Sequence, residues 1–205
     1  MKDATSPKTT RDAILDATER LLERFGYRKM TIEDLAREVG IGKGSVYLHF
    51  TSKEEIALSH IDRIIERLKR RLEIIASKPE PAAARVHEML IERVLFRFDS
   101  VQHYSQNLND MLSQVRAKLL ERRKRYFEEE ANLFAKVIEE GSASGEFRGV
   151  EPVAAAHALL LATNSLLPYS LSARELGERS EIEQKTRLVA DMLLTGLSVD
   201  KGRTH

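Results

Sequence analysis

The sequence contains no cysteine, which excludes disulfide bonds and every metal site built from thiolates. Glycine and proline are also scarce, ten and five among 205 residues, which suits an all-α chain with short connections. The longest apolar run, residues 153–162, is interrupted by a histidine and is too short to span a bilayer. The first ten residues are polar and lack the apolar segment of a secretory signal. We therefore expect a cytoplasmic protein without membrane contact.

Signatures of catalysis and of metal binding are missing as well. The six histidines show no HxxxH spacing and no histidine–carboxylate spacing on one helix, so no metal site is expected. The chain has no GxSxG nucleophile motif, no P-loop and no dinucleotide-binding fingerprint. We predict a protein that is not an enzyme and that uses no cofactor.

The most informative pattern lies within residues 31–53. A short helix is predicted over Ile32–Glu38, where apolar residues recur at helical spacing and Thr31 opens a capping box. Gly40 can take the left-handed conformation that closes a helix. A second short helix is predicted over Lys43–His49. Helix, glycine-containing turn and helix form a helix-turn-helix motif, whose second helix enters the major groove of DNA.

The outward residues of this second helix are mostly hydrogen-bonding groups. Lysine reaches guanine or phosphate, serine reaches a base edge or phosphate, and glycine permits close approach of the backbone. We predict base contacts from Lys43, Gly44 and Ser45. Phosphate contacts are predicted for Thr31, Tyr47, His49 and Lys53, the last because free backbone N–H groups at a helix start also bind anions. Glu33 is expected to repel phosphate.

These residues resemble the DNA-binding domain of the TetR family of bacterial transcriptional regulators. The resemblance runs over Thr10–Gly26, Thr31-x-x-x-Leu35-Ala36-x-x-x-Gly40-Ile41, Gly44–Phe50 and Lys53-Glu54-Glu55, roughly a quarter of the chain. A weaker likeness, Glu140-Gly141-x-x-x-Gly145-Glu146-Phe147, resembles the loop that ends the long seventh helix in many members. One departure is Gly42, which stands where the family often has a serine or threonine N-cap.

The overall charge does not favour DNA binding by itself. The net charge is +1, and residues 1–55 contain ten basic and ten acidic side chains. Binding must therefore come from a local basic surface, because the proposed DNA-binding part has no net positive field. We expect modest affinity for nonspecific DNA.

The resemblance and the helical periodicity together imply an all-α protein of about nine helices. Residues 1–52 would form the helix-turn-helix DNA-binding domain, and residues 53–205 a larger helical ligand-binding and dimerisation domain. The first helix is expected to bury Ile14, Ala17, Leu21, Leu22 and Phe25. In the larger domain, helices are predicted over 53–76, 82–98, 103–112, 114–141, 152–169 and 181–198, the last opened by a capping box at Ser180–Glu183.

Two segments, residues 152–170 and 181–198, are predicted to form a homodimer interface. The first is apolar over more of its circumference than a monomer core requires, and its small residues permit close helix approach. In TetR members the last two helices form a four-helix bundle with their copies, and a dimer suits a palindromic operator in double-stranded DNA. The alternative is a buried core helix in a monomer.

The resemblance also implies an apolar pocket for a small-molecule effector in the larger domain. The candidate lining residues are Phe96, Tyr104, Met111, Tyr126, Phe127, Phe134, Asn164 and Tyr169. Each aromatic residue also suits ordinary core packing. Asn164, inside an apolar helix, needs a hydrogen-bond partner, which could be a ligand, its copy across the dimer or a local group.

The predicted function is a ligand-responsive, sequence-specific DNA-binding transcriptional regulator. We expect a repressor that a small hydrophobic molecule releases from its operator. The alternative is a constitutive DNA-binding protein without an effector. A third hypothesis, an enzyme or carrier that uses the helical pocket, has no catalytic constellation in the sequence to support it.

Overall fold

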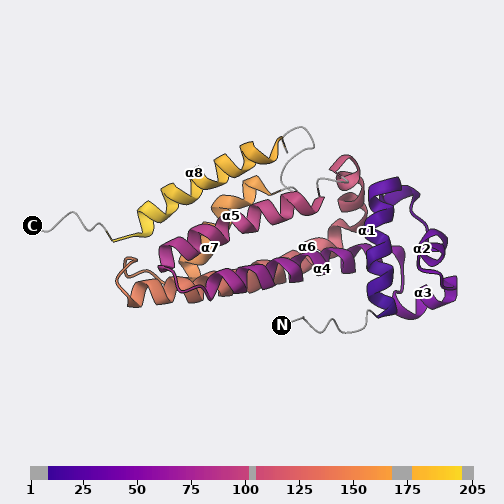
Figure 1. Cartoon of the computed structure of the whole chain (residues 1–205), viewed down its shortest axis with the longest axis horizontal. Helices are drawn as coiled ribbons and strands as arrows, with labels where there is room; N and C mark the ends of the chain where they lie inside the picture. The colour runs from indigo at the N-terminus through magenta and orange to yellow at the C-terminus, as the bar shows by residue number, and fades with distance from the viewer. Residues whose placement is uncertain (1–8, 102–104, 168–176, 200–205) are drawn as a thin grey trace, which may run out of the picture. The chain divides into compact units, whose positions relative to one another are not determined.

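The computed structural model of the chain describes residues 9–101, 105–167 and 177–199 (Figure 1). In these ranges the backbone is helical apart from short connections, and its one β-type contact is an isolated bridge between Phe147 and Ser198. The helices are α1 (Thr10–Lys29), α2 (Ile32–Val39), α3 (Lys43–His49), α4 (Lys53–Ala76), α5 (Ala82–Val101), α6 (Ser105–Ala143), α7 (Pro152–Thr163), the 3-10 helix η2 (Asn164–Leu166) and α8 (Arg179–Leu197). The all-α prediction is confirmed. None of these helices is long and apolar enough to cross a membrane.

The chain divides into two units. The first consists of Met1–Ile64 and His103–Leu120, and the second of Ile65–Gln102 and Glu121–His205. Helices α4 and α6 therefore each contribute residues to both units. The boundary that the sequence predicts, between residues 52 and 53, stays a prediction.

Local sequence signals set the helix ends in the first unit. Thr9 and Thr31 form capping boxes with the acidic residues three positions later, which satisfy the free N–H groups at the starts of α1 and α2. Gly40 adopts φ +78° and closes α2 in the left-handed conformation. These features confirm the predicted bounds of α2 and α3 to within one residue.

The first helix was expected to run to about Phe25 and to end at Gly26, but α1 continues beyond this residue. Gly26 has φ +70° and ψ 169°, so α1 kinks there and continues to Lys29. Ile14, Ala17, Leu21 and Leu22 are buried as expected, but Phe25 is 43% exposed, so its assignment to the core was wrong. The kink redirects the chain, and Tyr27 and Met30 are buried after it.

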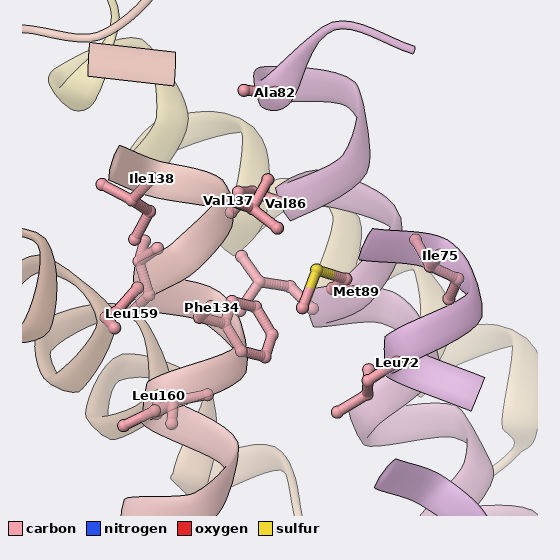
Figure 2. Close-up of a cluster of buried hydrophobic side chains, with 14 of the residues drawn as sticks. Leu72, Ile75, Ala82, Val86, Met89, Phe134, Val137, Ile138, Leu159 and Leu160 are labelled. Carbon is pink, nitrogen blue, oxygen red and sulfur yellow. The ribbon is translucent and has the colours of Figure 1, made fainter. Parts of the chain in front are cut away.

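The core of the second unit is a cluster of aliphatic and aromatic side chains from α4, α5, α6, α7 and α8. Figure 2 shows Phe134 of α6 between Met89 of α5 and Leu159 and Leu160 of α7. Helix α5 also lies along α8 (Figure 1). The apolar residues whose helical spacing predicted these helices form the faces that the helices bury against one another.

In the second half of the chain, the structure corrects three predictions of helix bounds. One helix, α6, runs over Ser105–Ala143 in place of the two helices expected over 103–112 and 114–141, and residues 103 and 104 lie outside the described residues. No proline or glycine stands between Ser105 and Glu140, and a serine within a helix weakens it by less than about 1 kcal/mol, so the helix continues. The segment therefore contains one helix fewer than expected.

Helix α7 ends at Thr163 and gives way to η2, six residues before the expected end at Tyr169. The Thr163 hydroxyl donates to the carbonyls of Leu159 and Leu160, the type of side-chain bond that competes with helical backbone bonding. Tyr169 itself lies outside the described residues. Helix α8 starts at Arg179 with Glu178 as N-cap, so the capping box predicted at Ser180 was wrong. The Glu183 carboxylate accepts from Arg179 and Arg187 and does not reach back to the helix start.

Candidate nucleic-acid interface

Helix α3 is fixed to the first unit by one buried side. Val46 is fully buried, and Phe50, directly after the helix, is 3% exposed. The turn before α3 is tied to α2, because the N–H groups of Gly40 and Ile41 both donate to the carbonyl of Ala36 at 2.9 Å. The remaining side of α3 is held outward by these anchors.

Five of the seven α3 residues are exposed and one is half-buried. The exposed residues are Lys43, Gly44, Tyr47, Leu48 and His49, and the half-buried residue is Ser45. All the α3 residues that the sequence predicts to contact DNA are thus accessible on one short helix. Whether they contact DNA stays a prediction.

Lys43 already has a partner in the protein. Its ammonium group forms an ion pair and hydrogen bond with the Glu33 carboxylate on α2. This hydrogen bond raises the pKa of Lys43 and lowers the pKa of Glu33. Both side chains are about half exposed, so a DNA phosphate or base edge could reach Lys43, in competition with Glu33.

Lys53 is more enclosed than its predicted role requires. Its ammonium group lies 4.4 Å from the centroid of the Tyr27 ring and donates to the carbonyl of Arg28 at 3.3 Å. Burial lowers the pKa of Lys53 and, with the nearby Glu54 carboxylate, raises the pKa of Tyr27. Lys53 therefore connects the start of α4 to the end of α1, besides any contact it makes with DNA.

Thr31 is also engaged locally. Its hydroxyl donates to the Asp34 carboxylate at 2.6 Å, and its backbone N–H donates to the same group at 3.2 Å. A phosphate contact from Thr31 would have to replace one of these bonds. On α4, Arg63 forms ion pairs with Asp16 of α1 at 2.6 Å and with Glu19 of α1 at 3.2 Å, so this basic side chain is held by groups of the same unit.

The predicted ligand-pocket residues are divided between the core and its edge. Phe134 is fully buried in the core of the second unit, with Phe96 and Phe127 half-buried against it. Met111 and Tyr126 are also buried. Tyr104 and Tyr169 lie outside the described residues. The structure brings Phe96, Phe127 and Phe134 into one cluster, and a ligand cavity there stays a prediction.

Asn164 takes part in a buried polar cluster that was not predicted from the sequence. Its side-chain oxygen accepts from Arg93 at 2.7 Å, and Arg93 also donates to Thr163 at 2.9 Å and to Glu130 at 2.8 Å. Arg97 forms a second ion pair with Glu130. Burial alone raises the pKa of Glu130, but the two guanidinium groups outweigh it and hold this pKa below its usual value.

A sequence signal for this cluster exists. Arg93 and Arg97 stand four residues apart on α5, and Arg93 continues the helical spacing of the buried residues Val86, Met89 and Leu90. Charged residues in such an apolar stripe indicate buried ion pairs, because a lone buried charge is too costly.

Within the described ranges, no group of three histidine or acidic side chains is arranged to hold a metal ion.

Helices α7 and α8 expose apolar side chains, as a dimer interface requires. On α7, Val153 is 38% and Leu161 62% exposed; on α8, Leu188 is 62% and Met192 69% exposed. Three α7 alanines, Ala154, Ala158 and Ala162, are exposed as well. Exposed apolar groups on neighbouring helices favour a contact surface over a solvated one.

Two family models match the chain. One, described as bacterial regulatory proteins of the tetR family, matches residues 14–59, which hold α2, α3 and most of α1. The other, described as the tetracyclin repressor-like C-terminal domain, matches residues 82–190, more than half of the chain. The first range contains the helix-turn-helix and the second contains most of the core of the second unit.

Individual proteins resemble the chain over nearly its full length. The uncharacterised HTH-type transcriptional regulator YfiR of Bacillus subtilis is 26% identical over 211 residues, covering 91% of this chain and 98% of that protein. Among solved structures, a transcriptional regulator from Cytophaga hutchinsonii has a TM-score of 0.74 at 23% identity, covering 91% of this chain and 97% of its own. FadR from Bacillus subtilis, in complex with stearoyl-CoA, has a TM-score of 0.68 at 17% identity, covering 90% and 98%. These two structures show a shared fold.

Proposed function

Because the chain belongs to the TetR family of bacterial transcriptional regulators, we propose that it is a homodimeric, ligand-responsive repressor that binds a palindromic operator. The observation that carries the proposal is the exposed face of α3, presented by two buried anchors, Val46 and Phe50. Residues 1–52 would bind DNA, and residues 53–205 would bind the effector and dimerise. Such a regulator acts in the cytoplasm, on the bacterial chromosome.

DNA contacts would divide between base reading and positioning. Lys43, Gly44 and Ser45 would approach the bases, and Thr31, Tyr47, His49 and Lys53 the phosphates. A dimer through α7 and α8 would carry two copies of α3 to half-sites one helical turn apart or a multiple of it. The exposed apolar residues of α7 and α8 support this arrangement.

The effector would be a small hydrophobic molecule bound by the second unit. Support comes from the aromatic side chains around Phe134 and from FadR, whose structure holds stearoyl-CoA. Helices α4 and α6 contribute residues to both units, so a change in these helices caused by effector binding in the second unit would reach the DNA-binding first unit. A ligand switches the protein only if it binds the two conformations with different affinity.

The decisive experiment begins by selecting duplexes from fragments of the source genome with the purified full-length protein, followed by footprinting. Operator affinity is then measured with and without probes that carry an apolar chain, stearoyl-CoA among them. A repressor of this kind should lose at least about tenfold in affinity with an effective probe, a coupling of ordinary size for allosteric proteins. A protein that binds its operator equally in every case would support the constitutive alternative.

The division of labour within α3 and α4 can be tested separately. Lys43→Ala should relax sequence preference, whereas Lys53→Ala should weaken binding on every duplex and reduce the salt slope by about one unit. Because Lys53 also contacts Tyr27 and Arg28, the melting temperature of Lys53→Ala must be measured alongside. If both variants act alike on operator and random DNA, the assignment of roles is wrong.

A further inference from the structure

The outermost line of α3, which is the row of residues pointing away from its buried side, has no polar side chain. Successive residues of an α-helix are rotated by about 100°, and Val46 is the fully buried side chain of α3. The direction opposite Val46 falls between Gly44 and Leu48, which are four residues apart. Leu48 is 84% exposed, more than any other large hydrophobic side chain in the described ranges. The part of α3 that projects farthest therefore carries no hydrogen-bonding side chain.

The polar side chains of α3 lie on the two flanks of this line. By the same rotation, Lys43 and Tyr47 follow one flank, and Ser45 and His49 follow the other. A helix in the major groove presents its outermost line to the base edges, and its flanks lie nearer the phosphate backbones. The polar side chains on the flanks can reach base edges or phosphates, and the apolar line is the part of α3 that lies nearest the bases.

Because Gly44 has no side chain, the α3 backbone is uncovered at this position of the outermost line. No atom of the protein lies within 4 Å of the position that a Cβ would occupy at Gly44, and its φ is not positive. Neither crowding nor backbone conformation inside the protein therefore requires glycine, although glycine weakens a helix relative to alanine. Its remaining physical effect is to let another molecule approach the α3 backbone closely.

We propose that Leu48 is a specificity-determining residue that reads thymine by contact with the C5-methyl group. Among the groups that base pairs display in the major groove, this methyl is the apolar one. Gly44, one turn earlier on the same line, permits the approach that the contact needs. The inference rests on the proposed function and deepens it by naming a base group that α3 recognises in the operator.

The test uses an operator selected from random duplexes by the full-length protein. Each thymine of a half-site is replaced in turn by deoxyuridine, which lacks only the C5-methyl group. For the wild-type protein we expect one position per half-site at which this replacement weakens binding about fourfold, the effect of one buried methyl group. Leu48→Ala should bind the thymine operator more weakly and be indifferent to deoxyuridine at that position.

Three further variants separate this contact from general effects. Leu48→Met keeps an apolar side chain of similar volume and should retain the deoxyuridine penalty. Ile74→Ala removes a side chain that is 64% exposed on α4 and should also retain it. Gly44→Ala should melt no lower than the wild type and should lose at least about tenfold in operator affinity, because its new methyl group would separate helix and bases.

The possible outcomes are distinct. If every deoxyuridine penalty persists in Leu48→Ala, or if no thymine of the half-site is sensitive to its methyl group, the inference is overturned while DNA binding stands. Equal operator affinity of Leu48→Ala and the wild type would also overturn it. Failure of the wild-type protein to select any duplex would overturn the proposed function together with the inference.

Discussion

Basic side chains of the first unit are engaged by groups of the same unit before any DNA arrives. Lys43 pairs with Glu33, Arg63 with Asp16, and Lys53 lies on the Tyr27 ring. Residues 1–55 contain equal numbers of acidic and basic residues, so this segment has no excess positive charge to hold DNA of any sequence. A DNA contact by Lys43 must therefore exchange Glu33 for a phosphate or a base.

Glu33→Gln tests this exchange at the residue scale. The substitution keeps the size of the side chain, removes the competing charge and leaves Lys43 free, so we expect tighter binding to operator and random DNA alike, by about threefold to tenfold at low salt. The gain should shrink as salt is added, because exposed charges are screened. Fluorescence anisotropy across a salt series measures both effects.

The matched control is Glu139→Gln, another exposed glutamate, in the second unit. It should leave both affinities close to the wild-type values. If Glu33→Gln binds random DNA no more tightly than the wild type, Glu33 does not restrain Lys43. Stability should not distinguish the variants, since surface ion pairs contribute little to folding.

At the scale of elements, the loop after α6 joins helices that are distant in the sequence. The Glu146 carboxylate accepts hydrogen bonds from the N–H groups of Ala82 and Ala83, both at 3.1 Å, and so caps α5. Phe147 is buried against Gly141 on α6. The Gly–Glu–Phe pattern that resembled a family loop therefore has a packing reason in this protein.

Gly141→Ala should destabilise the protein by about 1–3 kcal/mol, the usual cost of overfilling a packed site. A Cβ at this position would overlap the Phe147 ring and lie 2.8 Å from the Cβ of Ala82. Gly149→Ala is the control, because nothing lies within 4 Å of its Cβ position. Urea unfolding of both variants measures the difference in the free energy of unfolding. In a protein that already carries Phe147→Leu, adding Gly141→Ala should lower this free energy by less than it does in the wild type. Equal stability of the two single variants would contradict the packing argument.

A second element-scale feature is the ion-pair cluster that links α5 to α6. Glu130→Gln would leave Arg93 and Arg97 without their shared carboxylate and should lower the free energy of unfolding by about 3–5 kcal/mol near pH 7. Because the pKa of Glu130 is lowered from its ordinary value of 4.5, the stabilisation is complete above that value and is lost as the pH falls through the folded-state pKa.

The pH dependence provides the measurement. Unfolding free energies of the wild type and Glu130→Gln, followed between about pH 6 and pH 3.5, should differ most at the upper end and converge below the ordinary pKa. The exposed Glu139→Gln variant should run parallel to the wild type throughout. A gap that stays constant with pH would show that the ionised carboxylate is not what stabilises the cluster.

At the scale of the whole molecule, DNA recognition by the proposed mechanism needs two chains. Leu161 and Met192 expose 62% and 69% of their surface on α7 and α8, so the fold of one chain does not depend on covering them. Leu161→Glu and Met192→Glu should each raise the dimer dissociation constant at least about tenfold, because an unpaired charge would be buried at the interface. Sedimentation equilibrium measures the dissociation constant.

The control for dimerisation is Ile74→Glu, which places the same charge on an exposed α4 position. It should dimerise like the wild type. The interface variants should keep the wild-type melting temperature when compared as monomers, and should bind a full palindrome with the affinity of a single half-site. Unchanged dimerisation of both Leu161→Glu and Met192→Glu would show that α7 and α8 do not form the interface.

The sequence by itself determined the parts of this protein that depend on near neighbours. Capping boxes at Thr9 and Thr31, the left-handed glycine at Gly40 and the apolar spacing of α4 and α5 act within a few residues. The predicted bounds of α2 and α4 and the predicted start of α5 therefore agree with the structure to within one residue, whereas α1 continues past Gly26 and α5 past residue 98.

Tertiary structure decided what depends on partners far away in the sequence. Glu146 caps α5 from 64 residues away, and Lys43 of α3 pairs with Glu33 of α2. Arg93 and Glu130, 37 residues apart, become neighbours only when α5 packs on α6. Local pattern sets where a helix can begin and end; the choice between core, cap and surface follows the energy of contacts that exist only after folding.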